Sequence, residues 1–194
     1  MRHAVIVAHP NAHSFTIHMA QAYTHAAHAR HDTVFVRDLY RMGFDPCLKE
    51  GEVPTPKGFA PAEDVKAERE MIHEADVFAF FYPLWFNAPP AILKGYIDRV
   101  FGMGFGYGMG EGGNEPLLRG RRMISFTSSG APQRWLKETG SWDAMRKLFD
   151  EHVAGVCGFT VIDHIHFDSI VPGITEESVE ACAQQVREVV ESKL

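Results

Sequence analysis

The 194-residue sequence has few cysteines and no long apolar run. Cys47, Cys157 and Cys182 are dispersed, odd in number and form no CxxC pair. This argues against a disulfide framework and indicates a reducing compartment. No apolar run approaches the roughly 20 residues needed to span a bilayer, and no signal peptide is recognisable. We therefore expect a cytoplasmic protein without membrane insertion.

Basic residues are also scarce. The 19 Lys and Arg residues are outnumbered by 25 Asp and Glu, for a formal net charge of -6. That balance argues against a nucleic-acid partner or an anionic membrane surface. Neither a Walker loop nor a Gly-x-Ser-x-Gly elbow is present, and the alternating glycines of 102–110 are not a dinucleotide fingerprint. The composition thus excludes several common function classes.

The histidines predict no metal site. His18, His25 and His28 could share one helix face, but such a face is usually solvated. His164 and His166 fall on one side of a predicted strand without a further pair of ligands nearby. We predict that the protein holds no metal.

The most informative stretch is the beginning of the chain. The apolar run 4–8 indicates a strand buried on both faces, and Ser14 is a good N-cap for the helix that follows. A loop between a strand end and a helix N-terminus offers unpaired N–H groups and a positive dipole end to an anion. We interpret 9–15 as the phosphate site of a nucleotide-type cofactor. An ordinary strand-to-helix connection is the alternative.

Strand and helix patterns alternate along the whole chain. Strands are expected at 4–8, 33–37, 76–82, 122–127 and 159–167, and helices at 15–29, 61–74, 91–101, 142–156 and 175–192. This alternation predicts one α/β domain over 1–194, with a five-stranded parallel sheet in the flavodoxin-like order 2-1-3-4-5 and helices on both faces. The glycine-dense segment 102–113 and the polar segment 131–140 are expected to be irregular.

Three unusual loops leave the carboxyl ends of the strands near the predicted switch point. Loop 9–15 suits a phosphate, loop 83–89 carries the aromatic Trp85 and Phe86, and loop 127–134 offers hydroxyls and free amides. A planar ring with a polar edge, carried on a phosphate tail, describes a flavin. For the two aromatic residues, a staple over the core is the alternative.

Several segments occur in the order and spacing of a known family. They are Val7-Ala8-His9-Pro10 with Ser14-Phe15, Asp38-Leu39-Tyr40 with Phe44 and Pro46, Tyr82-Pro83-Leu84, Pro90-Ala91-Ile92-Leu93-Lys94-Gly95 with Arg99-Val100-Phe101, Thr127 with Gly130, and Cys157-Gly158-Phe159. In these segments, which cover most of the chain, the sequence resembles the NAD(P)H:quinone oxidoreductase family, the DT-diaphorase-like two-electron reductases with a flavodoxin-like fold.

The resemblance implies a tightly bound FAD, with FMN as the alternative, an NAD(P)H donor, a quinone-like acceptor and a homodimer with its active site at the subunit interface. By position, the flavin phosphate would be held by His9, Ser14, Phe15 and Thr16. The ring would be lined by Pro83, Leu84, Trp85, Phe86 and Asn87, and its polar edge contacted by Thr127, Ser128, Ser129 and Gly130. Phe105 and Tyr107 would form a wall for the substrate.

The chain departs from the family at two points. Family members place a Tyr and a His after the fourth strand to steady the charge of the reduced flavin, whereas here Trp135 falls near the Tyr position and no His is available. Arg134 is a candidate substitute by charge alone. A basic residue for the FAD pyrophosphate is also not evident in 175–178, which leaves FMN possible.

The resulting hypothesis is a ping-pong flavoenzyme that takes a hydride from NAD(P)H and passes two electrons to a quinone or similar electrophile. The alternatives are an FMN azoreductase or nitroreductase, and a flavoprotein regulatory subunit of a transport protein. A one-electron carrier flavodoxin is a further alternative, disfavoured because such carriers are usually strongly acidic.

Overall fold

A parallel sheet forms the centre of the molecule in the computed structural model, which describes residues 1–56 and 58–194. Its strands are β1 (Arg2–Val7), β2 (Thr33–Asp38), β3 (Val77–Pro83), β6 (Arg122–Ser128) and β7 (Thr160–Phe167). They are ordered β2-β1-β3-β6-β7, and all neighbours pair in parallel. This is the predicted 2-1-3-4-5 pattern, renumbered because two additional short strands precede β6.

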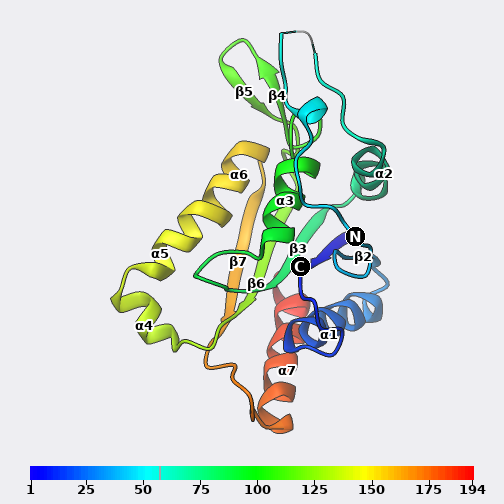
Figure 1. Cartoon of the computed structure of the whole chain (residues 1–194). Coiled ribbons are helices and arrows are strands. Elements are labelled where there is room, and N and C mark those ends of the chain that lie inside the picture. Colours follow the sequence, from blue (N-terminus) through cyan, green and yellow to red (C-terminus); the bar gives the residue numbers. More distant parts are fainter. Residues whose placement is uncertain (57) are drawn as a thin grey trace.

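Helices cover both faces of the sheet (Figure 1). Helices α1 (Phe15–Ala29) and α7 (Glu176–Lys193) pack on one face, over a core that includes Val5 and Val7. The other core includes Ala4 and Ile6 and is covered by α2 (Glu63–Ile72), α3 (Ala91–Val100), α5 (Ser141–Arg146), the π-helical turn η2 (Lys147–Glu151) and α6 (His152–Cys157). Successive residues of β1 therefore pack into the cores on opposite faces of the sheet, which explains why its apolar run is unbroken.

The predicted N-cap of α1 is confirmed, and α7 begins with a cap of the same kind. The N–H of Ile17 donates to Ser14 Oγ at 3.3 Å, and the N–H of Ser178 donates to Thr175 Oγ1 at 3.2 Å. Among the described residues, no helix is sufficiently long and apolar to cross a bilayer.

The expectation of an irregular 102–113 segment is wrong. Strands β4 (Tyr107–Gly110) and β5 (Gly113–Pro116) pair as an antiparallel hairpin at the end of the molecule opposite α4 (Figure 1). The glycines serve close packing and turning within this hairpin region. A Cβ on Gly106 would lie 2.0 Å from Phe101 O, and Gly113 closes the turn with φ +109°.

The predicted boundaries also differ around 131–156. The polar segment contains a short helix, α4 (Gln133–Glu138), which begins after Pro132 and ends near Gly140 at φ +71°. The predicted helix 142–156 is interrupted by η2, so three pieces replace one. A further 3-10 turn, η1 (Glu50–Glu52), lies in the predicted loop before α2. Single-turn elements of this kind carry too few residues to produce a periodic pattern.

Candidate functional site

The loops after β1, β3 and β6 enclose a cleft of about 180 Å³, called here the loop cleft. It is lined by His9, Phe15, Thr16, Pro83, Leu84, Trp85, Ser128, Ser129, Gly130 and Ile170. Nine of these ten residues are among the predicted cofactor contacts, and Ile170 is an addition. Residues that are far apart in the sequence are thus brought together at the carboxyl ends of the strands, where open α/β sheets bind their ligands.

The N-terminus of α1 provides the anion-binding character of the loop cleft. Within the described residues, the backbone N–H groups of Phe15 and Thr16 have no hydrogen-bond partner. Ser14 lies beside the cleft lining and uses its hydroxyl as the cap. The first turn contains no acidic side chain, so the positive end of the helix dipole is not neutralised.

His9 lies beside these free amides. His9 Nδ1 lies 3.1 Å from Asn11 N and 3.3 Å from Asn11 O, and when it accepts from the Asn11 N–H the neutral ring carries its proton on Nε2. Burial lowers the pKa of His9, which favours this neutral donor form at pH 7. Arg41, which the sequence reasoning missed, fixes the same loop: its Nη2 donates to His9 O at 2.7 Å and to Pro10 O at 2.8 Å.

The aromatic loop after β3 is a tight turn. Trp85 and Ala88 exchange two backbone hydrogen bonds of 3.1 Å, and the central Phe86 and Asn87 have φ of 50° and 57°. This left-handed conformation is costly for a residue such as Phe86, whose side chain is fully exposed. The strained turn therefore displays an aromatic side chain at the rim of the loop cleft.

Asn87 connects the turn to α5. Its Nδ2 donates to Ser141 O at 2.8 Å, whereas its Oδ1 is buried and has no hydrogen-bond partner in the part of the chain that the structure describes. Buried polar atoms are seldom left unpaired, because each one costs the free energy of a lost hydrogen bond. Asn87 lines the groove between α3 and α5 and not the loop cleft, so this unpaired acceptor is suited to receive a hydrogen bond from a ligand at the end of that groove.

The polar edge contains a buried hydroxyl and an unexpected histidine. Thr127 is 1% exposed, and its Oγ1 lies 2.7 Å from His164 Nε2 and 2.8 Å from His166 Nδ1. The expectation that no histidine is available here is wrong, because His166 Nε2 lies 3.1 Å from Ser129 Oγ. The two histidines come from β7, which pairs with β6.

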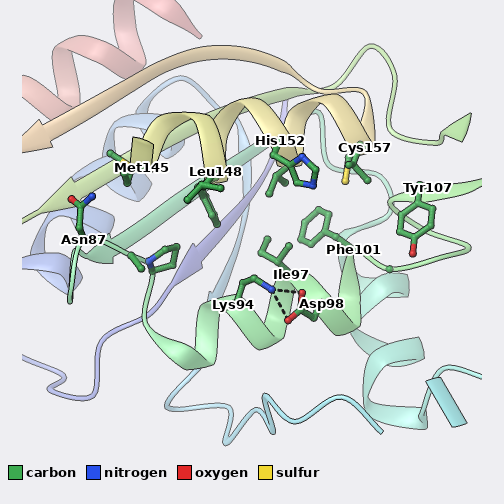
Figure 2. A pocket seen from close by; sticks show the side chains of 16 residues that line it. Asn87, Lys94, Ile97, Asp98, Phe101, Tyr107, Met145, Leu148, His152 and Cys157 are labelled. Carbon is green, nitrogen blue, oxygen red and sulfur yellow. Dashed lines mark hydrogen bonds and ion pairs between the residues drawn. The ribbon is translucent and has the colours of Figure 1, made fainter. Parts of the chain in front are cut away.

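A larger groove of about 580 Å³ lies between α3 and the α5–η2–α6 segment (Figure 2). It extends from Asn87 at one end to Tyr107 at the other, and its apolar lining includes Ile97 and Leu148. Among the predicted substrate residues, Tyr107 lines this groove, whereas Phe105 is 9% exposed and packs against Phe101 with ring centroids 5.8 Å apart. Neither residue lines the loop cleft of the same chain.

Comparisons with known proteins agree on one family. The profile of the family with the flavodoxin-like fold matches residues 1–190. An uncharacterized NAD(P)H oxidoreductase of Haemophilus influenzae is 34% identical, over 87% of this chain and 82% of that protein. NAD(P)H dehydrogenase (quinone) 1 of Cavia porcellus is 31% identical, over 84% of this chain and 66% of its own length. The structure of an NAD(P)H:quinone oxidoreductase from Methanothermobacter marburgensis superimposes with a TM-score of 0.86 at 29% identity, covering 98% of this chain and 95% of that one.

Proposed function

We propose that this chain, which belongs to the flavodoxin-like fold family and within it to the NAD(P)H:quinone oxidoreductases, binds a flavin in the loop cleft and reduces quinones or similar electrophiles by two electrons. One observation carries the proposal. The loops after β1, β3 and β6 bring a free helix N-terminus, an aromatic turn and a row of hydroxyls to one cleft.

The phosphate side of the cleft fits an anion. The free amides of Phe15 and Thr16 and the Nε2–H of His9 are three donors at the positive end of α1. Arg41 adds a positive charge behind the His9 loop. The proposed cofactor is FAD, with FMN as the alternative. Arg41 is a basic residue close to this phosphate site, and the sequence reasoning did not identify it.

The ring side of the cleft fits a flat conjugated group. The lining includes apolar surface from Leu84 and Trp85. It also includes hydroxyl and amide groups from Ser128, Ser129 and Gly130. The unpaired Oδ1 of Asn87, on the same turn as Trp85, offers an acceptor at the end of the groove. Apolar stacking supplies most of the affinity for such a ring, and a few polar groups fix its orientation.

A bound flavin would supply hydride acceptance from NAD(P)H and two-electron transfer to an acceptor, with donor and acceptor using the site in turn as in a ping-pong reaction. The protein's own residues orient and shield this exchange. Trp85 covers part of the cleft, and the amides at the start of α1 hold the negative tail.

The active assembly is proposed to be a homodimer in the cytoplasm. The groove between α3 and α5–η2–α6 is mainly apolar, and Leu148 on its rim is 76% exposed. Tyr107 lies at the end of this groove opposite Asn87, so it would reach a loop cleft only if that cleft belonged to a second copy. In this arrangement Tyr107 contacts substrate, and Phe105 supports it from the core.

The experiment is a steady-state assay of the flavin-loaded protein. NAD(P)H oxidation is followed at several fixed concentrations of a simple quinone, with an azo dye and a nitroaromatic compound as competing acceptor classes. Parallel double-reciprocal plots with the quinone preferred would support the proposal. Preference for the azo dye would replace the acceptor class, and flavin uptake without turnover of any acceptor would favour a regulatory flavoprotein.

A further inference from the structure

A continuous series of hydrogen bonds runs from the core to the loop cleft. His164 Nδ1 lies 2.6 Å from Asp150 Oδ2, and His164 Nε2 lies 2.7 Å from Thr127 Oγ1. Thr127 Oγ1 is 2.8 Å from His166 Nδ1, and His166 Nε2 is 3.1 Å from Ser129 Oγ. Ser129 lines the cleft, whereas Asp150 and His164 are buried, so the series connects a sealed acidic group to the ligand site.

Neighbouring residues hold the two imidazoles in place. The indole of Trp142 packs on both, with ring centroids 5.1 Å from His164 and 5.4 Å from His166. The inner end is held by Ser125, whose hydroxyl donates to Asp150 Oδ1 at 2.9 Å. Fixed rings and short contacts are what proton transfer between side chains requires.

The outer end adds one more constraint. Ser129 Oγ donates to Ala131 O at 2.9 Å, and its hydroxyl has a single hydrogen. If Ser129 gives that hydrogen to Ala131, then His166 Nε2 must carry a proton in order to donate to Ser129. Because Thr127 also has one hydrogen, it can donate to only one of its two imidazole neighbours and must accept from the other. Every contact is then satisfied only when Asp150, His164 and His166 together hold one proton more than an ionised carboxylate with two neutral imidazoles.

The surroundings decide where the extra proton lies. Burial, followed by the nearby charge of His164, lowers the pKa of His166 to about 4, and Asp168 opposes this shift. His166 is therefore the neutral member at pH 7. The extra proton therefore lies within the His164–Asp150 pair, whose Nδ1 and Oδ2 atoms are 2.6 Å apart. The other charged groups nearby are Arg146, at 3.7 Å from Asp150, and Asp163, which is paired with Lys193.

We propose that Asp150, His164, Thr127, His166 and Ser129 form a proton relay that delivers one proton at Ser129 Oγ into the loop cleft when the electron acceptor is reduced. The inference rests on the proposed function. Reduction of a quinone to a hydroquinone takes two electrons and two protons, and NAD(P)H supplies a hydride, which accounts for both electrons and one proton. The relay supplies the second proton.

Each bond in the transfer is accounted for. The Ser129 hydroxyl turns from Ala131 O towards the loop cleft and gives up its hydrogen there, while Ser129 Oγ takes the Nε2 proton of His166. His166 Nδ1 then takes the hydrogen of Thr127, and Thr127 takes the Nε2 proton of His164. The relay loses one positive charge, and the proton on His166 has moved from Nε2 to Nδ1. Uptake of one proton from solvent restores the first arrangement.

The coupled movement of two protons gives a signature that a static buried network does not have. When His164 gives up its Nε2 proton, His166 must change tautomer in the same step, because Thr127 has one hydrogen to donate. Long-range ¹H–¹⁵N spectra of the imidazoles read both changes directly, and they need neither flavin nor turnover. We expect one common transition for the two rings in the flavin-free protein.

Thr127→Val breaks the relay with little change of side-chain shape, and Thr24→Val on α1 is the matched control. Thr24 Oγ1 donates to Ala20 O at 2.8 Å, away from the cleft lining. In Thr127→Val the tautomer of His166 should no longer follow His164, whereas Thr24→Val should behave as the wild type. A wild-type His166 that keeps one tautomer throughout the His164 transition would overturn the relay.

The delivery role is tested in single turnovers of the flavin-loaded protein. Thr127→Val should slow oxidation of the reduced protein by a quinone about 10–100-fold, and by more than it slows the reduction by NAD(P)H. Ser129→Ala removes only the exit hydroxyl, so it should slow the same half-reaction while the two rings still switch together. This second variant decides the matter if Thr127→Val does not fold.

The possible failures are distinguishable. Normal quinone reduction in both variants would overturn delivery by this relay, with flavin binding and the proposed function intact. A wild-type protein that takes up no flavin, yet shows the tautomer switch, would overturn the proposed function and with it the delivery role.

Discussion

The indole of Trp85 packs against the imidazole of His9, with ring centroids 5.8 Å apart and ring planes at 60°. Strands β1 and β3 are neighbours in the sheet, so the loops that follow them lie side by side. The contact joins the aromatic loop after β3 to the proposed phosphate loop after β1. In the proposed flavin site, this one pair of side chains would couple stacking on the ring to binding of the phosphate.

Replacing Trp85 by alanine should weaken flavin binding about tenfold or more, because an aromatic stacking contact contributes about 0.5–1.5 kcal/mol beyond its buried area. Quenching of flavin fluorescence during titration of the flavin-free protein measures this affinity. Trp135→Ala is the matched control, since Trp135 is 53% exposed on α4 and does not line the loop cleft. Equal loss of affinity in both variants would contradict the placement of the ring.

The helix caps of α1 and α7 allow an effect on stability to be distinguished from an effect on flavin binding. Ser14→Ala and Thr175→Ala each remove one cap hydroxyl and should each lower the free energy of unfolding by about 1 kcal/mol. Only Ser14→Ala alters the start of α1 beside the loop cleft, so only this variant should weaken flavin binding. Urea denaturation and flavin titration give the two quantities. Unchanged flavin affinity in Ser14→Ala would argue against a phosphate at this helix end.

A pair of helical glycines tests the packing of α3. A Cβ on Gly95 would lie 2.1 Å from Pro46 O and 2.4 Å from Pro46 Cβ, so α3 sits directly against the chain that follows β2. Gly95→Ala should therefore destabilise the protein by about 1–3 kcal/mol despite the better helix propensity of alanine. Gly155→Ala on α6 meets no atom within 4 Å and should stabilise it by roughly 0.5–1 kcal/mol. Similar changes in unfolding free energy for both variants would refute this close approach.

Stability should fall on mild acidification because His3 is buried as a neutral ring. His3 is 0% exposed, its Nδ1 lies 2.7 Å from Tyr23 Oη, and burial lowers its pKa to about 4. The unfolded chain, with an ordinary histidine pKa near 6.5, binds a proton that the folded protein does not. The contribution is complete above pH about 6.5 and is lost as the pH falls towards 4, amounting to about 1–2 kcal/mol at pH 5.

Denaturation at pH 7 and pH 5 measures this loss. His3→Gln should reduce the difference between the two pH values, whereas His25→Gln, at an exposed position on α1, should leave it unchanged. The depressed pKa of His166 acts in the same direction, so part of the difference should persist in His3→Gln. An identical pH dependence in His3→Gln and the wild type would show that His3 is not the source.

The sheet and the loop cleft were predictable because their signals are local. An unbroken apolar run marks a strand buried on both faces, and all residues of β3 are indeed buried. Parallel strands end at a common edge, so the loops after β1, β3 and β6 had to converge. The β4–β5 hairpin was missed because its glycines carry no apolar alternation, and its pairing is visible only in three dimensions.

The relay was not predictable for a different reason. Thr127 and His166 face one another because β6 and β7 pair in a particular register, which shifts at an irregularity between Met123 and Ile124. A one-residue slip would turn these side chains to the opposite face. Asp150 comes from the π-helical turn η2, whose presence no sequence pattern indicated. Sequence alone suggested only a histidine pair on one side of a strand.

The central claim is that the loop cleft binds a flavin. The most direct measurement is the visible absorption spectrum of the freshly purified protein, with the released chromophore identified by mass. The account predicts a flavin spectrum that NAD(P)H bleaches and a quinone restores, and the mass distinguishes FAD from FMN. A colourless protein that takes up neither flavin on reconstitution would contradict it.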